Sequence, residues 1–175
     1  MNGGVELENR REYYRTFIIL KQDTRGYSFS NKEPSGYCKV DAYGNKAKVQ
    51  VYVQDLKPVA KEQCYKIYLL ANLPTGSRQV PIKSFYVDEK GKRDVKLDIN
   101  RNNVGESGLA IEQFEGVAIV VDDSSSNNLA PLTGFKREPF MWRNTKNNRP
   151  DPVEEKVKPE ERKEVQKRTE REEAK

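Results

Sequence analysis

The feature that most constrains the fold is a strict two-residue alternation of apolar and polar side chains over residues 47–54. The apolar positions are Ala47, Val49, Val51 and Val53, and the polar positions between them are Lys48, Gln50, Tyr52 and Gln54. In a β-strand, successive side chains point to opposite faces, so this period predicts a strand with one buried and one solvated face. A half-solvated strand of this kind is typical of antiparallel sheets.

The same pattern recurs along the chain. Gly44 and Asn45 tolerate the positive φ of tight turns, so residues 37–42 and 47–54 are predicted to form a hairpin. Further strands are predicted at residues 13–22, 65–71, 80–87, 95–99, 117–121 and 132–135. Short strands at this spacing predict an all-β fold, an antiparallel β-sandwich or small barrel of about seven strands with one short helix.

Four local expectations follow from the patterns. The unbroken apolar run at residues 17–20 predicts a central strand covered on both faces, and the β-branched run at 117–121 predicts the most buried strand. Residues 80–87 and 95–99 are expected to pair as a hairpin across residues 88–92. The short helix is expected at residues 107–114, with Ser107 as its N-cap.

Charge separates the C-terminal end of the chain from the rest. Residues 151–175 contain nine acidic and eight basic residues and little apolar surface, too little to offset the entropy of ordering. We therefore expect a β domain at residues 13–143, preceded by an N-terminal extension at 1–12. Residues 144–175 are expected to be a linker and charged tail, disordered or a solvated helix. Of the net charge of +5, residues 1–150 carry +6 and the tail −1.

Histidine is absent from the sequence, which removes the commonest general base and most catalytic triads. The alternation around Cys38 predicts a buried structural thiol, whereas Cys64 is expected on the solvated face or at a strand end, and a disulfide stays open for both. The segment 98–103 resembles the start of a calcium loop but lacks the required glycine and the closing glutamate. We expect no enzyme activity, no metal and no cofactor.

Two groups of residues are candidate binding sites. Lys48, Tyr52, Lys66 and Tyr68 interleave cations and aromatic rings on strands that could pair, a composition typical of surfaces that bind polyanions. An ordinary exposed strand face would have the same composition. Phe140 and Trp142 follow the last predicted strand, either as closure of the core or as an exposed anchor for a partner.

Several segments together resemble a group of uncharacterised β-rich proteins from spore-forming clostridia. They are residues 36–40, 51–56, 65–70, 80–82, 85–88, 108–109 and 131–135. The resemblance covers residues 13–142 and rests on the pattern of strands and turns. It implies a bacterial structural or interaction module connected with the spore or the cell envelope, and it implies no catalytic residues.

Two functions are therefore expected from the sequence. The favoured one is a non-enzymatic structural or self-associating β module whose partner is another protein or a second copy. The alternative is a module that binds a polyanion, either nucleic acid or an anionic wall polymer. No signal peptide or membrane span is visible, so we expect synthesis in the cytoplasm, with spore or envelope association as a later location.

Overall fold

The computed structural model describes residues 13–122 and 129–143. Within these residues, eight strands form one antiparallel sheet that nearly closes into a barrel. The strands are β1 (Tyr14–Gln22), β2 (Ser35–Tyr43), β3 (Lys46–Gln54), β4 (Cys64–Leu73), β5 (Gly76–Phe85), β6 (Arg93–Asn100), β7 (Phe114–Asp122) and β8 (Leu132–Phe135). The all-β prediction is therefore confirmed, and the contact pattern divides the chain after Met141, beyond the last strand.

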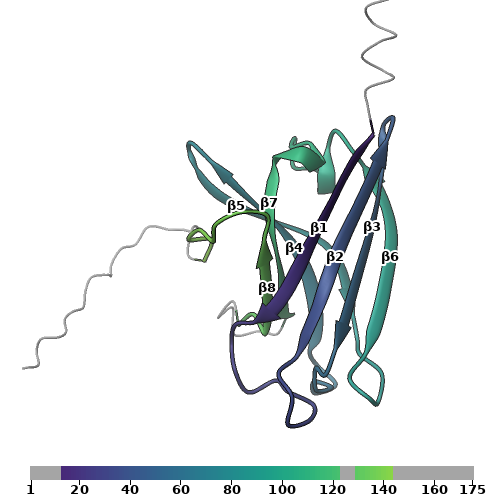
Figure 1. The fold of residues 1–175 in the computed structure, drawn as a ribbon, viewed down its shortest axis with the longest axis vertical. Helices are drawn as coiled ribbons and strands as arrows, with labels where there is room; N and C mark the ends of the chain where they lie inside the picture. Colours follow the sequence, from purple (N-terminus) through teal and green to yellow (C-terminus); the bar gives the residue numbers. More distant parts are fainter. Residues whose placement is uncertain (1–12, 123–128, 144–175) are drawn as a thin grey trace, which may run out of the picture. The chain divides into compact units, whose positions relative to one another are not determined.

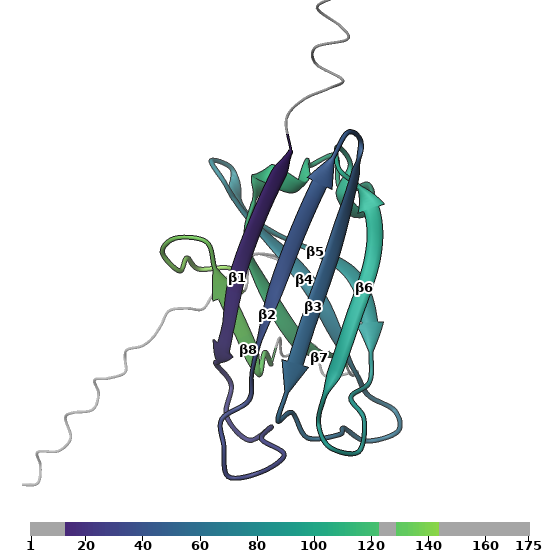
Figure 2. The same ribbon diagram turned by 45° about the vertical axis from the view of Figure 1, so that its right-hand side comes forward.

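The sheet has the order β5-β4-β7-β8-β1-β2-β3-β6, so β5 and β6 are its two edges. Strands β1, β2, β3 and β6 run side by side and form what we call the front wall (Figures 1 and 2). In Figure 2, strands β4, β5 and β7 cross behind the front wall and are inclined the opposite way. The apolar faces of the two groups meet between them, as in other folds in which sheets pack face to face.

Alternation along β3 produces the predicted burial. Val49, Val51 and Val53 are buried, whereas Lys48 on the other face is exposed. The predicted hairpin is also confirmed, because β2 and β3 pair from Ser35 opposite Gln54 to the turn. Residues 117–121 are all buried, on both faces of β7, as the β-branched run predicted.

The expectation of a doubly covered strand at residues 17–20 is wrong. Ile18 and Leu20 are buried, but Phe17 and Ile19 are 54% and 53% exposed. Strand β1 lies in the front wall, so every second residue of β1 must face outward whatever its hydrophobicity. The apolar run therefore contributes two side chains to the core and leaves the other two as an exposed apolar surface.

The expected hairpin of residues 80–87 with 95–99 is also wrong. Strand β5 pairs with β4, and β6 pairs with β3. The tight turn between Leu73 and Gly76 joins β4 to β5 directly. The connection from Phe85 to Arg93 instead carries the chain from one edge of the sheet to the other.

The expected helix at residues 107–114 is replaced by two 3-10 turns, Val104–Glu106 and Ile111–Gln113. Gly105, Glu106 and Gly108 have positive φ, which interrupts a right-handed helix. The hydroxyl of Ser107 accepts a hydrogen bond from the Leu109 N–H, 3.1 Å away, and so closes a local turn instead of capping a helix. No helix in the described residues is long and apolar enough to cross a membrane.

Strand β8 joins the two halves of the sheet. It pairs with β7 from Gly116 to Ile119, and with β1 only at Lys21 and Gln22. Gly134 allows this junction, because a Cβ atom at this position would lie 2.2 Å from the carbonyl oxygen of Ile19. A close approach of two backbones requires a residue without a side chain.

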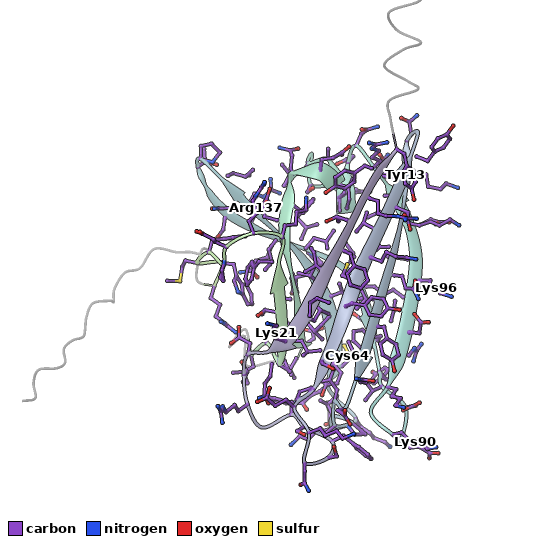
Figure 3. The ribbon with its side chains drawn as sticks, viewed as in Figure 1. Tyr13, Lys21, Cys64, Lys90, Lys96 and Arg137 are labelled. Atoms are coloured by element: carbon purple, nitrogen blue, oxygen red, sulfur yellow. The ribbon has the colours of Figure 1, made fainter. Side chains whose placement is uncertain are left out.

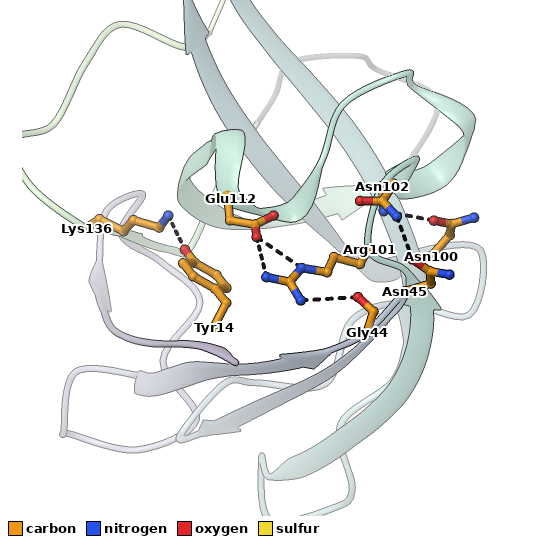
Figure 4. A network of polar contacts seen from close by, with 8 residues as sticks. All are labelled: Tyr14, Gly44, Asn45, Asn100, Arg101, Asn102, Glu112 and Lys136. Carbon is orange, nitrogen blue, oxygen red and sulfur yellow. Dashed lines mark hydrogen bonds and ion pairs between the residues drawn. The ribbon is translucent and has the colours of Figure 1, made fainter. Parts of the chain in front are cut away.

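One end of the barrel is closed around Arg101, a charged residue that is only 1% exposed. Its Nε and Nη2 atoms donate to Glu112 Oε2 at 3.0 and 2.6 Å, and its Nη1 donates to the carbonyl of Gly44 at 3.1 Å (Figure 4). The guanidinium thus ties the turn at residues 111–113 to the β2–β3 hairpin. Nearby, the Asn102 side chain donates to Asn45 Oδ1 at 3.1 Å.

Candidate functional site

The outer face of the front wall is a grid of side chains fixed by strand register. Residues directly opposite one another on neighbouring strands point to the same face, so each set of partners forms a row across β1, β2, β3 and β6. The three central rows are Ile19–Tyr37–Tyr52–Asp94, Phe17–Lys39–Gln50–Lys96 and Arg15–Asp41–Lys48–Asp98. In Figure 3, Tyr13 and Lys21 mark the two ends of β1, and Lys96 projects from β6.

Apolar side chains gather where the first two rows meet, and we call Phe17, Ile19, Tyr37 and Tyr52 the aromatic patch. The ring of Phe17 stacks on Tyr37 with centroids 5.1 Å apart, and Tyr37 lies 5.6 Å from Tyr52. Phe17 and Ile19 are more than half exposed, whereas Tyr37 and Tyr52 are partly buried. The rings face one another along the wall, which leaves mainly their edges for a partner.

The third row alternates in charge across the wall. Arg15 Nε lies 2.6 Å from Asp41 Oδ1, and the hydroxyl of Tyr13 donates to the same carboxylate. These hydrogen bonds, from Tyr13 first and then from Arg15, lower the pKa of Asp41 below its usual value. Asp41 is therefore a stable anion between the cations Arg15 and Lys48.

A shallow hollow of about 520 Å³ lies on the outer face beside the aromatic patch. Its charged lining consists of Lys39, Asp41, Lys48, Lys96 and Asp98. Close by, the Gln50 amide donates to Asp94 Oδ1 at 3.0 Å. The hollow thus offers cations and carboxylates side by side, and it carries no strong excess of either charge.

The four residues predicted to form a cationic aromatic face do not lie together. Lys48 and Tyr52 are on β3, but Lys66 and Tyr68 are on β4, and these two strands do not pair. The expected pairing of these strands is wrong, because alternation fixes the face of each strand but not its neighbours, and a binding role of the four residues stays a prediction. Lys66 Nζ is paired with Asp122 Oδ2 at 3.1 Å, and that contact raises the pKa of Lys66. Burial raises the pKa of Tyr68.

The predicted residues after the last strand differ in surroundings. Phe140 packs edge-on against Phe135, with ring centroids 5.3 Å apart. It also borders an open hollow of about 670 Å³ that is lined by Glu115 and Arg137. Trp142 is 3% exposed, and the guanidinium of Arg143 lies 4.5 Å from its ring centroid. A role of Phe140 or Trp142 in binding stays a prediction.

The two cysteines have different surroundings. Cys38 is fully buried, as predicted, and burial raises its pKa to about 12, which disfavours the thiolate. Cys64 is partly exposed, and both thiols are free. In the described residues, no three His, Cys, Asp or Glu side chains are grouped so that they could hold a metal ion. The most distinctive surface is therefore the aromatic patch with its charged row.

Sequence reasoning missed half of the aromatic patch. The apolar run predicts that Phe17 and Ile19 lie in the core, but both are exposed. The alternation of β3 correctly predicts that Tyr52 lies on the outer face. A signal was present nonetheless. A run of four apolar residues followed by Lys21 and Gln22 fits a strand with an interaction surface on its outer face as well as it fits a central strand.

Comparison with known proteins gives a family match over most of the chain. Residues 12–147 match the family described as a domain of unknown function (DUF7922). This range contains all eight strands. No curated protein and no solved structure matches the chain.

Proposed function

The chain belongs to the DUF7922 family, whose function is unknown, and we propose that it is a non-enzymatic structural module that self-associates through the aromatic patch. The observation that carries this proposal is the exposure of Phe17 and Ile19, each more than half accessible, beside Tyr37 and Tyr52. Contiguous apolar residues with a polar rim are typical of surfaces at which proteins meet.

The charged row indicates a second copy as the partner. From β1 to β6 the row reads Arg15, Asp41, Lys48, Asp98, which is positive, negative, positive, negative. If two front walls stack face to face about a two-fold axis parallel to the strands, between β2 and β3, each row meets itself reversed. Asp41 then faces the partner's Lys48, and Arg15 faces the partner's Asp98. Every charge of this row meets its opposite.

The same axis brings the aromatic residues together. Tyr37 faces the partner's Tyr52, Phe17 faces the partner's Lys96, and Ile19 faces the partner's Asp94. Stacked sheets are rotated by roughly 30° relative to each other, so the residues nearest the axis make the closest contacts. Those residues are Tyr37, Tyr52, Asp41 and Lys48, which come from β2 and β3.

A polyanion fits this surface less well. A polymer of phosphates is bound by cations that lack acidic neighbours, because binding depends on neutralising charge and releasing counterions. Here Lys48 stands opposite Asp41 and Asp98, and on the other half of the sheet Lys66 is paired with Asp122. These carboxylates would repel a polyanion from the lysines that were predicted to bind it.

The test is sedimentation velocity of the full chain over a wide range of concentration, with Ile19→Glu as the variant, because a carboxylate at position 19 would face the partner's Asp94. The introduced carboxylate would place a charge in the aromatic patch, so the variant should lose the face-to-face contact and sediment as smaller species at concentrations where the unmodified chain associates. Phe29→Glu is the matched control, since Phe29 is 45% exposed in a loop outside the patch. The melting temperatures of both variants should stay near that of the unmodified chain.

Two results would contradict the proposal. An unmodified chain that sediments as a monomer at all concentrations would show that the patch does not bind a second copy. Equal effects of Ile19→Glu and Phe29→Glu would show that association does not use the patch. Binding of nucleic acid or a wall polymer that weakens steeply with salt would favour the polyanion alternative instead.

The cellular place that we propose rests on the resemblance to β-rich proteins of spore-forming clostridia. A self-associating module that is synthesised in the cytoplasm would suit a layer of the spore or the cell envelope. Fluorescent labelling of the full chain during sporulation tests this, and uniform cytoplasmic fluorescence at every stage would argue against it.

A further inference from the structure

The second surface that points to a partner is the free edge of β6. Strand β6 pairs with β3 along one side, and among the described residues no strand pairs with its other side. Figure 2 shows β6 as the outer margin of the front wall. A free strand edge presents backbone N–H and C=O groups that can pair with another strand.

The register of the neighbouring hairpin identifies which backbone groups are free. A two-residue turn joins Tyr43 and Lys46, and such a turn closes on a hydrogen-bonded pair. In antiparallel sheets, bonding direction alternates along each strand, so Val49 points its backbone groups toward β6. Its partner Leu97 points back toward β3. The backbone groups of Lys96 and Asp98 therefore point away from the sheet.

The other edge of the sheet is not suited to pairing in this way. Strand β5 contains Pro81, which has no N–H to donate, and its register with β4 shifts between Ile67 and Tyr68. Proline and irregular pairing are common devices that protect a strand edge. Strand β6 has eight residues, no proline and an unbroken register with β3.

We propose that β6 pairs antiparallel with β6 of a second copy, in the register centred on Leu97, so that two front walls form one continuous sheet. In this register Lys96 lies opposite the partner's Asp98, and Asp98 lies opposite the partner's Lys96. Both side chains are exposed on the outer face. On the inner face, Val95 lies opposite the partner's Ile99. Opposite charges and apolar pairs across strands both stabilise a sheet.

Neighbouring registers are disfavoured by charge. Centring the pair on Lys96 places Lys96 against itself and Asp94 against Asp98, and centring it on Asp98 places Asp98 against itself. Like charges directly opposite each other destabilise a sheet. Centring on Val95 pairs Lys96 with Asp94 but shortens the overlap of the two strands. The charges of β6 thus disfavour the neighbouring registers of the β6–β6 pair and allow the register centred on Leu97.

This contact is separate from the face-to-face contact proposed above. Antiparallel strands in one sheet are related by a two-fold axis perpendicular to the sheet, so both outer faces point the same way. The aromatic patch lies mainly on β1, β2 and β3 and stays uncovered. The edge contact can therefore be measured in full-length protein that carries Ile19→Glu, whether or not the face contact exists.

The experiment exchanges charges at the paired positions in the Ile19→Glu chain. Lys96→Glu or Asp98→Lys alone creates two like-charge pairs in the dimer, and each should raise the dissociation constant by roughly tenfold or more. The double variant Lys96→Glu with Asp98→Lys restores opposite charges and should recover most of the affinity. Lys83→Glu on β5 is the matched control, because it makes the same charge change on the other edge. Sedimentation equilibrium measures the affinity, and thermal melting checks the fold.

Amide exchange measured by NMR tests the backbone pairing without any substitution at the edge. In the Ile19→Glu chain, the amides of Lys96 and Asp98 should become protected as concentration rises. Loss of affinity in the single variants without recovery in the double variant would overturn the register. Unprotected amides at concentrations where the protein is dimeric would overturn the edge contact itself, as would a monomer at all concentrations. If a single variant fails to fold, the amide measurement still decides.

Discussion

At the scale of single residues, Arg101 is the side chain on which the closed end of the barrel depends most. It is almost completely buried, and its guanidinium contacts the Glu112 carboxylate and the Gly44 carbonyl (Figure 4). A buried cation has a large desolvation cost, which these charge-assisted hydrogen bonds offset. Only the planar guanidinium reaches both partners at once.

We therefore predict that Arg101→Ala lowers the free energy of unfolding by about 3 kcal/mol, because it leaves a cavity and removes the ion pair with Glu112. Arg101→Lys should recover only part of the loss, since an ammonium group cannot donate in the same fork geometry. Urea denaturation followed by circular dichroism gives both values. A wild-type midpoint in Arg101→Lys would show that charge alone is sufficient at this position.

The two thiols should differ sharply in reactivity. Cys38 is fully buried, and burial raises its pKa to about 12, whereas Cys64 is partly exposed at the start of β4. In the folded protein, Ellman's reagent should modify Cys64 and leave Cys38 unmodified until urea unfolds the chain. Mass spectrometry of the labelled peptides identifies the sites. Rapid labelling of both thiols in the folded state would contradict the assigned burial of Cys38.

At the scale of elements, β8 is the link that turns two groups of strands into one sheet. Its junction with β1 spans only Lys21 and Gln22, and it brings Gly134 against the backbone of Ile19. Gly134→Ala would force a methyl group into that contact. We predict a loss of at least about 2 kcal/mol in the free energy of unfolding, measured by thermal denaturation.

Gly26→Ala serves as a comparison for the steric argument. A Cβ atom at Gly26 meets nothing within 4 Å, although the positive φ of this residue disfavours alanine. Its cost should reflect backbone conformation alone, about 1 kcal/mol. A smaller loss at Gly134 than at Gly26 would mean that the β1–β8 junction relaxes easily.

The sequence predicted the elements better than it predicted their neighbours. Alternation in residues 47–54 identified the inner and outer faces of β3, because burial on one face of a strand is a local pattern. Pairing is not local, and β5 and β6, although adjacent in the chain, lie at opposite edges of the sheet. For the same reason Lys66 could not be separated from Lys48 in advance. The exposed Phe17 was missed because hydrophobicity alone does not distinguish core from interface.

At the scale of the whole molecule, the two proposed contacts together determine how copies assemble. Each contact is two-fold, and the axes differ in direction, one along the strands and one perpendicular to the sheet. A subunit with two different two-fold contacts binds a new neighbour at each, so assembly continues without closing unless the geometry happens to form a ring. Open chains or layers of this kind would suit the structural role that we propose.

We predict that the average mass of the unmodified chain rises continuously with concentration. Ile19→Glu should stop growth at the edge dimer, and Lys96→Glu should stop it at the face dimer. The variant with both changes should be monomeric, because neither contact remains. Multi-angle light scattering measures these masses, and negative-stain microscopy shows whether the large species are linear. An unmodified chain that stops at a dimer would mean that only one of the two contacts forms.

The pairing of β1 with β8 also limits when the sheet can close during translation. Gln22 pairs with Leu132, so the sheet cannot close until about 110 further residues have left the ribosome. The β2–β3 hairpin involves only neighbouring residues and can form long before that. We expect nascent chains to be resistant to protease only after residue 135 has emerged, and a chaperone that shields apolar strands would act in the interval before it.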